Sequence, residues 1–248
     1  MSAQLSTLST AAQQLVSHMP HAIWRADQMG SYATGVTASG HPALDAELPN
    51  HGWPAATLIE LLLQQTGIGE MQLLRPALAT IAQQRRIVLV QPPHAPHIAA
   101  WLGSGLPPER LLWIKTARSA DALWSAEQVL RNGSCGAVLL WQTQVRSEAL
   151  RRLHLAAQGG DTVFWMFRPL TTAQDASPSP LRLGLRPARA GIEIDLIKRR
   201  GPHAAQTLYL PLAAMPSAPA TIPPVRHALL DQRASAAIST RNLAPALV

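Results

Sequence analysis

Residues 58–71, LIELLLQQTGIGEM, place a short apolar run directly before a turn that contains two glycines. An apolar run of this length predicts a strand covered on both faces, as in a parallel sheet. In nucleotide-binding α/β folds, the loop after such a strand holds phosphate on backbone N–H groups and on the next helix N-terminus. Gly67 and Gly69 give the loop the required flexibility. The stretch therefore predicts an α/β fold with a candidate phosphate loop.

The chain beyond this stretch continues the same alternation. Apolar runs follow at 87–90, 111–115, 137–141 and 162–167, and helical patterns separate them at 71–81, 97–102, 120–130 and 146–157. Alternating strands and helices predict repeated β-α-β units and a mainly parallel central sheet flanked by helices.

The pattern changes after Pro169. Residues 171–180 predict a loop, and alternating apolar residues at 181–185 and 192–196 predict a C-terminal antiparallel β-hairpin extension, with a third strand at 207–212. We therefore divide the chain into an N-terminal helix and lead-in segment (1–35), an α/β core with the hairpin (36–212), and an Ala/Pro-rich basic tail (213–248). Helices are also expected at 4–18 and, against a partner, at 225–238.

The composition limits the class of protein. Hydrophobic residues make up 47% of the chain and charged residues 14%, which excludes a disordered acidic protein. The chain has neither an apolar stretch of about 20 residues nor a signal-peptide pattern, so we expect a soluble cytoplasmic protein without membrane contact. The single Cys135 excludes a disulfide framework and a cysteine-based zinc cluster.

The positive charge of the chain lies mostly in its last third. The net charge is +7, yet residues 1–176 carry twelve Arg or Lys against eleven Asp or Glu, and residues 177–248 carry nine against three. This asymmetry predicts an anionic partner, either nucleic acid or an acidic protein surface.

The candidate phosphate loop lacks the side chains that nucleotide chemistry needs. A working loop is followed by a Lys for the terminal phosphates and a Ser or Thr for magnesium, but here Glu70 and Met71 stand at those positions. A carboxylate at a helix N-terminus satisfies the helix dipole and repels a triphosphate. Gly67, Gly69, Glu70 and Met71 are therefore a degenerate phosphate loop, and an ordinary strand-to-helix turn is the simpler alternative.

Several segments resemble known families. Ser39-Gly40, Leu44-Asp45 and residues 52–55, in this order before 58–61, are similar to the start of the ATPase core of RecA-like recombinases. The segments 44–54, 59–79, 88–96 and 196–202, together with Trp24-Arg25, resemble the ImuA family of proteins associated with translesion DNA synthesis, which are often named together with SulA-type proteins. The resemblance implies a RecA-like core.

The positions that serve catalysis in RecA-like ATPases carry other residues here. In that family a catalytic Glu follows the second core strand, but this chain has Val90-Gln91 there. His94 nearby is a candidate base, although an ordinary histidine on the loop surface is the simpler interpretation. An acidic magnesium ligand is expected at Trp141-Gln142, and neither residue is a carboxylate. We therefore predict a pseudo-ATPase that is not an enzyme and needs no cofactor or metal. A residual ATPase completed by a neighbouring subunit is a third possibility.

The basic residues of the hairpin are candidate contacts to DNA or to a partner. Lys198, Arg199 and Arg200 precede a Gly-Pro stop, and Arg182, Arg186 and Arg189 belong to the same hairpin. Exposed cations at a loop contact phosphates or an acidic protein face, although a solvated charge run is an equal alternative.

The tryptophans are expected in two kinds of place. Trp101, Trp113, Trp124 and Trp165 fall in helical or strand patterns and are expected in the core. Trp24 and Trp53 flank loops, where one of them is a candidate interface anchor.

The sequence is compatible with two functions. The resemblance implies a non-hydrolysing accessory factor in SOS mutagenesis and translesion DNA synthesis. Its partners would be a Y-family-like polymerase homologue (ImuB) and an error-prone C-family polymerase, with RecA and DNA as further candidates. The alternative is a regulatory inhibitor of recombinase filaments or of cell division, of the SulA type.

Overall fold

The apolar run at 58–63 forms the central strand of the fold. The computed structural model describes residues 35–200 and 206–212, and in it β3 (Thr57–Leu63) is buried along its whole length. It pairs in parallel with β7 (Val163–Pro169) on one side and with β8 (Leu181–Ala188) on the other. Both edges and both faces of β3 are thus covered, which explains its apolar sequence.

The expected alternation of strands and helices is present. The strands are β1 (Val36–Thr37), β2 (Trp53–Pro54), β3, β4 (Arg86–Val90), β5 (Leu111–Ile114), β6 (Cys135–Trp141), β7, β8, β9 (Gly191–Lys198) and β10 (Leu208–Pro211). The helices are α2 (Pro42–Glu47), α3 (Glu70–Ala82), α4 (Ile98–Gly103), α5 (Ser119–Asn132) and α6 (Ser147–Ala157). Short 3₁₀ turns occur at Pro49–His51, Pro108–Arg110 and Leu170–Gln174, the last of them within the expected connection after β7.

One mixed sheet of eight strands organises the described residues, in the order β10-β9-β8-β3-β7-β6-β4-β5. The five strands from β3 to β7 are parallel, while β9 is antiparallel to β8 and β10 is antiparallel to β9. The expected hairpin is therefore present, but it is not a separate appendage. Because β8 pairs with β3, the hairpin extends the central sheet.

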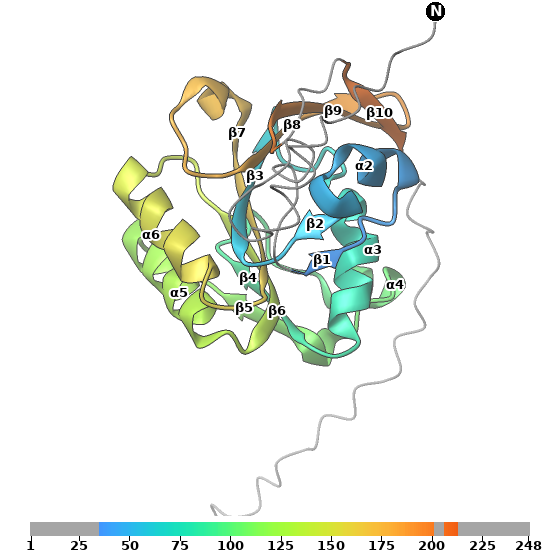
Figure 1. The fold of residues 1–248 in the computed structure, drawn as a ribbon. Coiled ribbons are helices and arrows are strands. Elements are labelled where there is room, and N and C mark those ends of the chain that lie inside the picture. Colours follow the sequence, from blue (N-terminus) through green and yellow to red (C-terminus); the bar gives the residue numbers. More distant parts are fainter. Residues whose placement is uncertain (1–34, 201–205, 213–248) are drawn as a thin grey trace, which may run out of the picture. The chain divides into compact units, whose positions relative to one another are not determined.

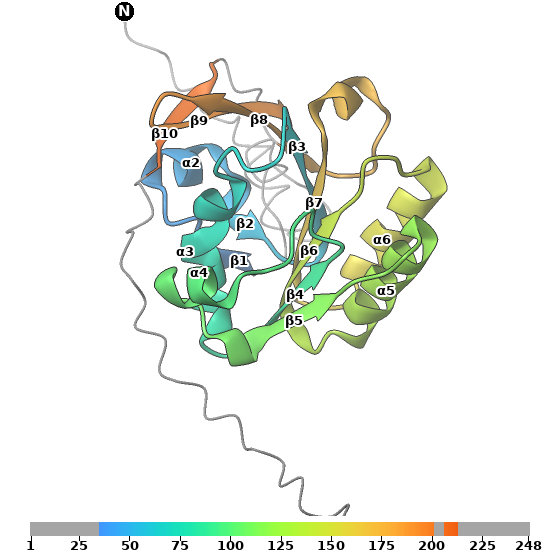
Figure 2. The same cartoon turned by 180° about the vertical axis from the view of Figure 1, so that it is seen from behind.

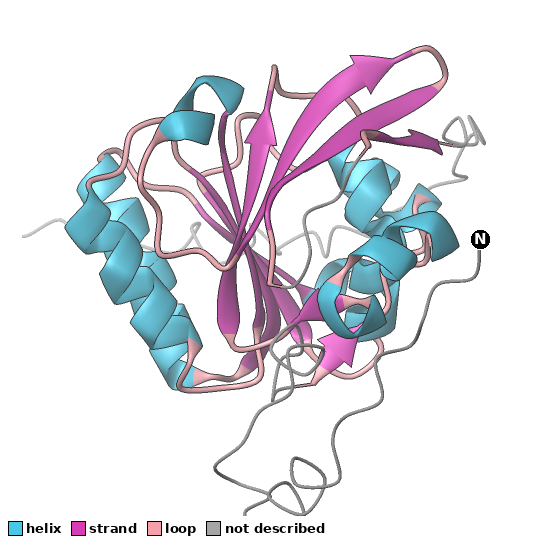
Figure 3. Cartoon of the chain, turned by 45° about the horizontal axis from the view of Figure 1, so that its top comes forward, coloured by secondary structure: helices cyan, strands magenta, loops and turns pink. Residues whose placement is uncertain are grey.

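Helices cover the sheet on both faces (Figure 1, and from behind in Figure 2). Helices α2, α3 and α4 lie on one side and α5 and α6 on the other, with the sheet between them (Figure 3). Two apolar clusters correspond to these faces, one containing Leu74, Leu78 and Trp165, the other Leu130, Leu153 and Phe164. The mainly parallel, helix-flanked sheet is thus confirmed.

The segment before β3 packs closely on α3. Gly40 has φ +79°, and a Cβ atom there would lie 2.3 Å from the Cβ of Pro76. The backbone N–H of Ser39 donates to Asp45 Oδ1 at 2.8 Å, which ties this turn to α2. The Ser39-Gly40 and Leu44-Asp45 pieces therefore hold the turn before α2 in place, against Pro76 of α3 and against Asp45.

The tryptophans differ in part from expectation. Trp165 is fully buried and Trp101 is 8% exposed, as expected for core residues. Trp113 and Trp124 are 42% and 60% exposed, so the core assignment is wrong for both: Trp113 lies on edge strand β5 and Trp124 on the outer face of α5. Trp53 is fully buried in an edge-to-face contact with Trp165, so it is no exposed anchor.

Three expectations fall on residues outside the described part of the chain: the helices at 4–18 and 225–238 and the role of Trp24. Within the described residues, no helix combines the length and the apolar character that crossing a membrane requires.

Candidate functional site at the carboxyl edge of the sheet

The degenerate phosphate loop binds its own carboxylate. Gly67 and Gly69 have φ values of +82° and +108°, and the Gly67 N–H donates to Glu70 Oε1 at 2.8 Å. Glu70 is the first residue of α3 and only 5% exposed. A negative group at this position is stabilised by the helix N-terminus. The carboxylate therefore occupies a backbone donor that a phosphate loop would present to an anion.

The loop is also closed from the hairpin side. A Cβ atom on Gly69 would lie 2.5 Å from Leu212 Cδ1, so the residue after β10 packs directly on the loop. The φ of Gly69 excludes most other residues independently of this contact. Residues separated by much of the chain therefore fix the shape of the turn between β3 and α3.

The two other strand ends have structural roles. Gln91 has φ +53°, and its Oε1 accepts hydrogen bonds from the N–H (3.0 Å) and the hydroxyl (3.2 Å) of Thr116. This amide thus links the loops that follow β4 and β5. Trp141, at the end of β6, stacks on Phe167 with ring centroids 4.4 Å apart. In an ATPase, these two positions would carry a general base and a metal ligand. Here Gln91 links two loops, and Trp141 packs β6 against β7.

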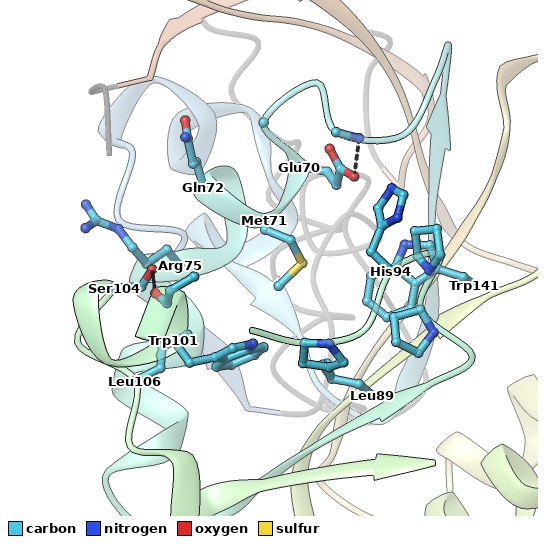
Figure 4. Close-up of a pocket in the computed structure, with 16 residues that line it drawn as sticks. Glu70, Met71, Gln72, Arg75, Leu89, His94, Trp101, Ser104, Leu106 and Trp141 are labelled. Carbon is cyan, nitrogen blue, oxygen red and sulfur yellow. Dashed lines mark hydrogen bonds between the residues drawn. The ribbon is translucent and has the colours of Figure 1, made fainter. Parts of the chain in front are cut away.

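A cavity of about 370 Å³ opens beside the loop, between α3, α4 and the segment after β4 (Figure 4). Its wall is largely apolar: Met71, Leu89, Pro92, Pro93, Pro96, Ala100, Trp101, Leu106 and Trp141 line it, with Gly67, Gly69, Glu70, Gln72, Arg75, His94 and Ser104. Glu70 lies at the loop end of this cavity (Figure 4). Its volume is near the lower end of the range for small-ligand sites, about 300–1,000 Å³.

A second, more polar cavity of about 450 Å³ lies along the same edge. Its polar side chains are Gln64, Gln65, Thr66, Gln91, Ser119, Gln142, Thr143 and Arg168. Pro92, Pro93 and Trp141 border both cavities, so the two share a wall. The carboxyl ends of parallel strands are where α/β folds bind ligands.

A buried ion cluster on β3 was not expected from the sequence. Glu60 Oε1 accepts from Arg168 Nη1 at 2.8 Å, and Glu60 Oε2 lies 2.7 Å from Arg182 Nε. The side chain of Glu60 is fully buried, and those of Arg168 and Arg182 are 3% and 5% exposed. Asp175 Oδ2 approaches Arg168 at 3.3 Å. The signal in the sequence was a charged residue inside two apolar strand patterns, Glu60 and Arg182, and one directly after a third, Arg168.

Among the candidate hairpin cations, ion pairs are formed by Arg182, Arg186 and Arg199. Arg182 belongs to the buried cluster, and its guanidinium also donates to the carbonyls of Thr172 and Ala173. Arg186 pairs with Asp195, and Arg199 Nη1 contacts Glu47 Oε2 at 2.7 Å. Because its side chain is buried, Arg182 cannot reach DNA or a partner in this structure, which corrects its place among the expected contacts.

Lys198, Arg189 and Arg200 are exposed. Lys198 Nζ donates to the carbonyl of Ser177 at 3.0 Å, which anchors one side of the hairpin. Arg189 is in the turn between β8 and β9, where its carbonyl accepts from the Tyr209 hydroxyl. The six cations therefore do not form one patch, and a contact to DNA or to a partner stays a prediction for the exposed ones.

The titratable residues of the core have local explanations. His94 is exposed in the loop after β4 and lines the apolar cavity, and His97 precedes α4. Burial raises the pKa of the Cys135 thiol, as expected for an inert small residue at the start of β6. Burial, together with the charges of Arg200 and Lys198, lowers the pKa of His154. In the part of the chain that the structure describes, no group of His, Cys, Asp and Glu could hold a metal ion.

Comparison with known proteins identifies the class of protein that part of this chain resembles. A family model described as cell division inhibitor SulA matches residues 57–164. The matched region begins at β3 and ends within β7, so it contains both cavities except for residues 167–169. The chain therefore contains a SulA-like region.

Individual proteins that this chain resembles in sequence are also named SulA. SulA of Edwardsiella piscicida is 28% identical over 145 residues, covering 54% of this chain and 84% of that protein. SulA of Serratia proteamaculans (strain 568) is 29% identical over 125 residues, covering 50% and 74%. The crystal structure of SulA from Pseudomonas aeruginosa is 28% identical and covers 47% of this chain and 99% of that chain, with a TM-score of 0.40.

Proposed function

We propose that this protein is a regulatory inhibitor of the SulA type, which acts in the SOS response by binding a protein of the cell-division machinery. The SulA match over residues 57–164 carries this proposal, because the matched region contains the degenerate loop and its apolar cavity. The relatives named above are cell division inhibitors, a function that needs protein contact rather than catalysis.

The geometry of the loop supports a function without ATP hydrolysis. Glu70 already holds the Gly67 N–H, and Gln91 and Trp141 are engaged in contacts to Thr116 and Phe167. Phosphoryl transfer needs positive charge and metal ions around the phosphates. We expect no ATP turnover above background and no shift in melting temperature with ATP. DNA-stimulated hydrolysis by the purified protein would contradict this part of the proposal.

An exposed strand edge in the SulA-like region is a candidate contact surface. β5 ends the sheet, and two consecutive residues on it, Leu112 and Trp113, are 43% and 42% exposed. They point to opposite faces of the strand, so an added partner strand would contact both. An unpaired strand edge is a common docking site for an extended partner segment.

A second candidate function has its own observation. Two segments that resemble the ImuA family, 44–54 and 196–202, lie outside the SulA-matched region, and the hairpin that contains the start of the second one extends the central sheet. These features favour an accessory factor in translesion synthesis, with a RecA-like core and with the ImuB-type and C-family polymerases as partners. RecA itself is a further candidate partner.

One experiment in cells separates the two functions. The full chain is expressed in a deletion strain, and cell length is measured by microscopy beside the mutation frequency after ultraviolet damage. The inhibitor proposal expects filamentous cells in undamaged cultures and an unchanged mutation frequency. Normal division with a restored mutation frequency would overturn it in favour of the accessory factor.

Variants on two exposed apolar residues refine this experiment. Trp113→Ala on β5 is expected to reduce filamentation, because it removes a side chain from the proposed contact edge. Leu155→Ala is the matched control, since Leu155 is 65% exposed on α6 in the same matched region. An equal effect of both variants would contradict the assignment of the contact to β5.

DNA binding by the hairpin is tested separately. Lys198→Ala combined with Arg200→Ala leaves the Arg199–Glu47 ion pair intact. If these cations contact phosphates, the double variant binds DNA more weakly for all sequences and has a flatter salt dependence. An unchanged salt slope would remove DNA from the proposed partners of the hairpin.

A further inference from the structure

One oxygen of the Glu70 carboxylate, Oε2, has no structural role that the described contacts explain. Oε1 accepts the Gly67 N–H, but Oε2 is buried without a hydrogen-bond partner among the described residues. A buried charged oxygen without a partner is costly, and native proteins rarely retain one without a reason. The Glu70 side chain is only 5% exposed, and it lines the apolar cavity beside α3.

The cavity offers no cation of its own to this oxygen. Arg75 on α3 is a lining residue, but its side chain points away from Glu70, and no ion pair joins the two within the described chain (Figure 4). The other basic lining residue is His94, which is on an exposed loop. Glu70 therefore borders a cavity whose wall is otherwise mostly apolar, with Oε2 buried beneath its surface.

The remaining wall suits a cation with an apolar stem. Trp101 and Trp141 bring indole rings to the cavity, and aromatic faces attract guanidinium and ammonium groups. Met71, Leu89 and Leu106 provide the surface against which a methylene chain packs. The buried Nε1 of Trp141 also lacks a partner in the described part of the chain.

We propose that this cavity binds a basic side chain, arginine or lysine, of the partner protein. The inference rests on the proposed function, which requires a protein partner. Charge complementarity selects the occupant: the Glu70 Oε2 accepts from the cationic head, and the aromatic and apolar wall holds the stem. In this proposal, the site beside the degenerate phosphate loop binds a cation, whereas a working phosphate loop binds an anion.

Three probes of the same shape and different charge test this site on the full chain. Benzamidine carries a cationic head on an apolar ring, benzamide is its neutral analogue and benzoate its anionic one. We expect titration calorimetry to show benzamidine binding at least about tenfold more tightly than benzamide, and benzoate binding least. Equal binding of the three probes, or a preference for benzoate, would overturn the proposal.

Variants connect the preference to Glu70. Glu70→Gln keeps the shape of the side chain and is expected to abolish the tenfold preference for benzamidine. Glu148→Gln is the matched control, because Glu148 is also in the first turn of a helix, α6, but is exposed and does not line the cavity. A preference that survives Glu70→Gln would refute the role of this carboxylate.

A second variant tests the location of the site independently, in case Glu70→Gln does not fold. Ala100 is an exposed residue of α4 at the cavity wall, so Ala100→Trp narrows the cavity without changing the core. It is expected to weaken benzamidine binding, and unchanged binding would refute the location. Filamentation without any cation preference would refute this inference alone, whereas cation binding without filamentation would refute the proposed inhibitor function.

Discussion

The buried ion cluster on β3 and the loop that follows this strand each contain a buried glutamate in a different environment. Glu60 contacts two arginines within 2.8 Å, and its charge is compensated from β7 and β8. Glu70 has one backbone donor and one unpartnered oxygen within the described residues. The comparison teaches that burial alone does not assign a role: the compensated carboxylate supports the sheet, and the partly satisfied one is available to a ligand.

The largest effect is expected for Glu60→Gln. The substitution leaves Arg168 and Arg182 buried without their shared counter-charge, which costs about 3–5 kcal/mol of the free energy of unfolding. Urea unfolding measures the loss, with Glu193→Gln as the control because Glu193 is exposed on β9. A loss below about 1 kcal/mol would show that the cluster is not essential to the sheet.

Gly69→Ala is expected to rank second. The residue has φ +108° and its new methyl group would collide with Leu212, so we expect a loss of about 1–3 kcal/mol. Gly67→Ala is the comparison: φ is +82° there, but nothing lies within 4 Å of the added Cβ. Adding Leu212→Ala should recover part of the loss at Gly69 and none at Gly67. Equal behaviour of both glycines would argue against the contact between the loop and the end of β10.

A smaller effect is expected for Glu70→Gln on stability. The amide oxygen still accepts the Gly67 N–H, and the lost attraction to the helix N-terminus is about 0.3–1 kcal/mol. The free energy of unfolding should therefore change by less than about 1 kcal/mol, in contrast to Glu60→Gln. Thermal and urea unfolding of the two variants side by side provide the measurement. Similar losses for both would remove the distinction between the two carboxylates.

The smallest effect concerns His154 and pH. Its pKa in the folded protein is below the ordinary value of 6.5, first because of burial and then because of Arg200 and Lys198. As pH falls through about 6.5, the unfolded chain takes up a proton at this position before the folded protein does. The contribution to stability is thus present above that pH and decreases below it. His154→Gln should flatten this part of the stability profile, and an unchanged profile would assign the pH dependence to other groups.

Much of the fold was predictable from local patterns. The apolar runs at 87–90, 111–115 and 137–141 became β4, β5 and β6 because period and length are properties of neighbouring residues. The order of the strands was not predictable in this way. The pairing of β8 with β3 joins positions more than a hundred residues apart, and nothing local specifies it.

The same distinction between local sequence and tertiary structure applies to the candidate site. The sequence alone determined that the loop lacks the Lys and hydroxyl side chains of a phosphate site, because those residue types are either present at their positions or absent. Only the tertiary structure decided that Glu70 closes on Gly67, that Arg182 is buried against Glu60, and that Trp113 is exposed at a sheet edge. Burial and charge pairing depend on which strands become neighbours, and that is decided by packing of the whole chain.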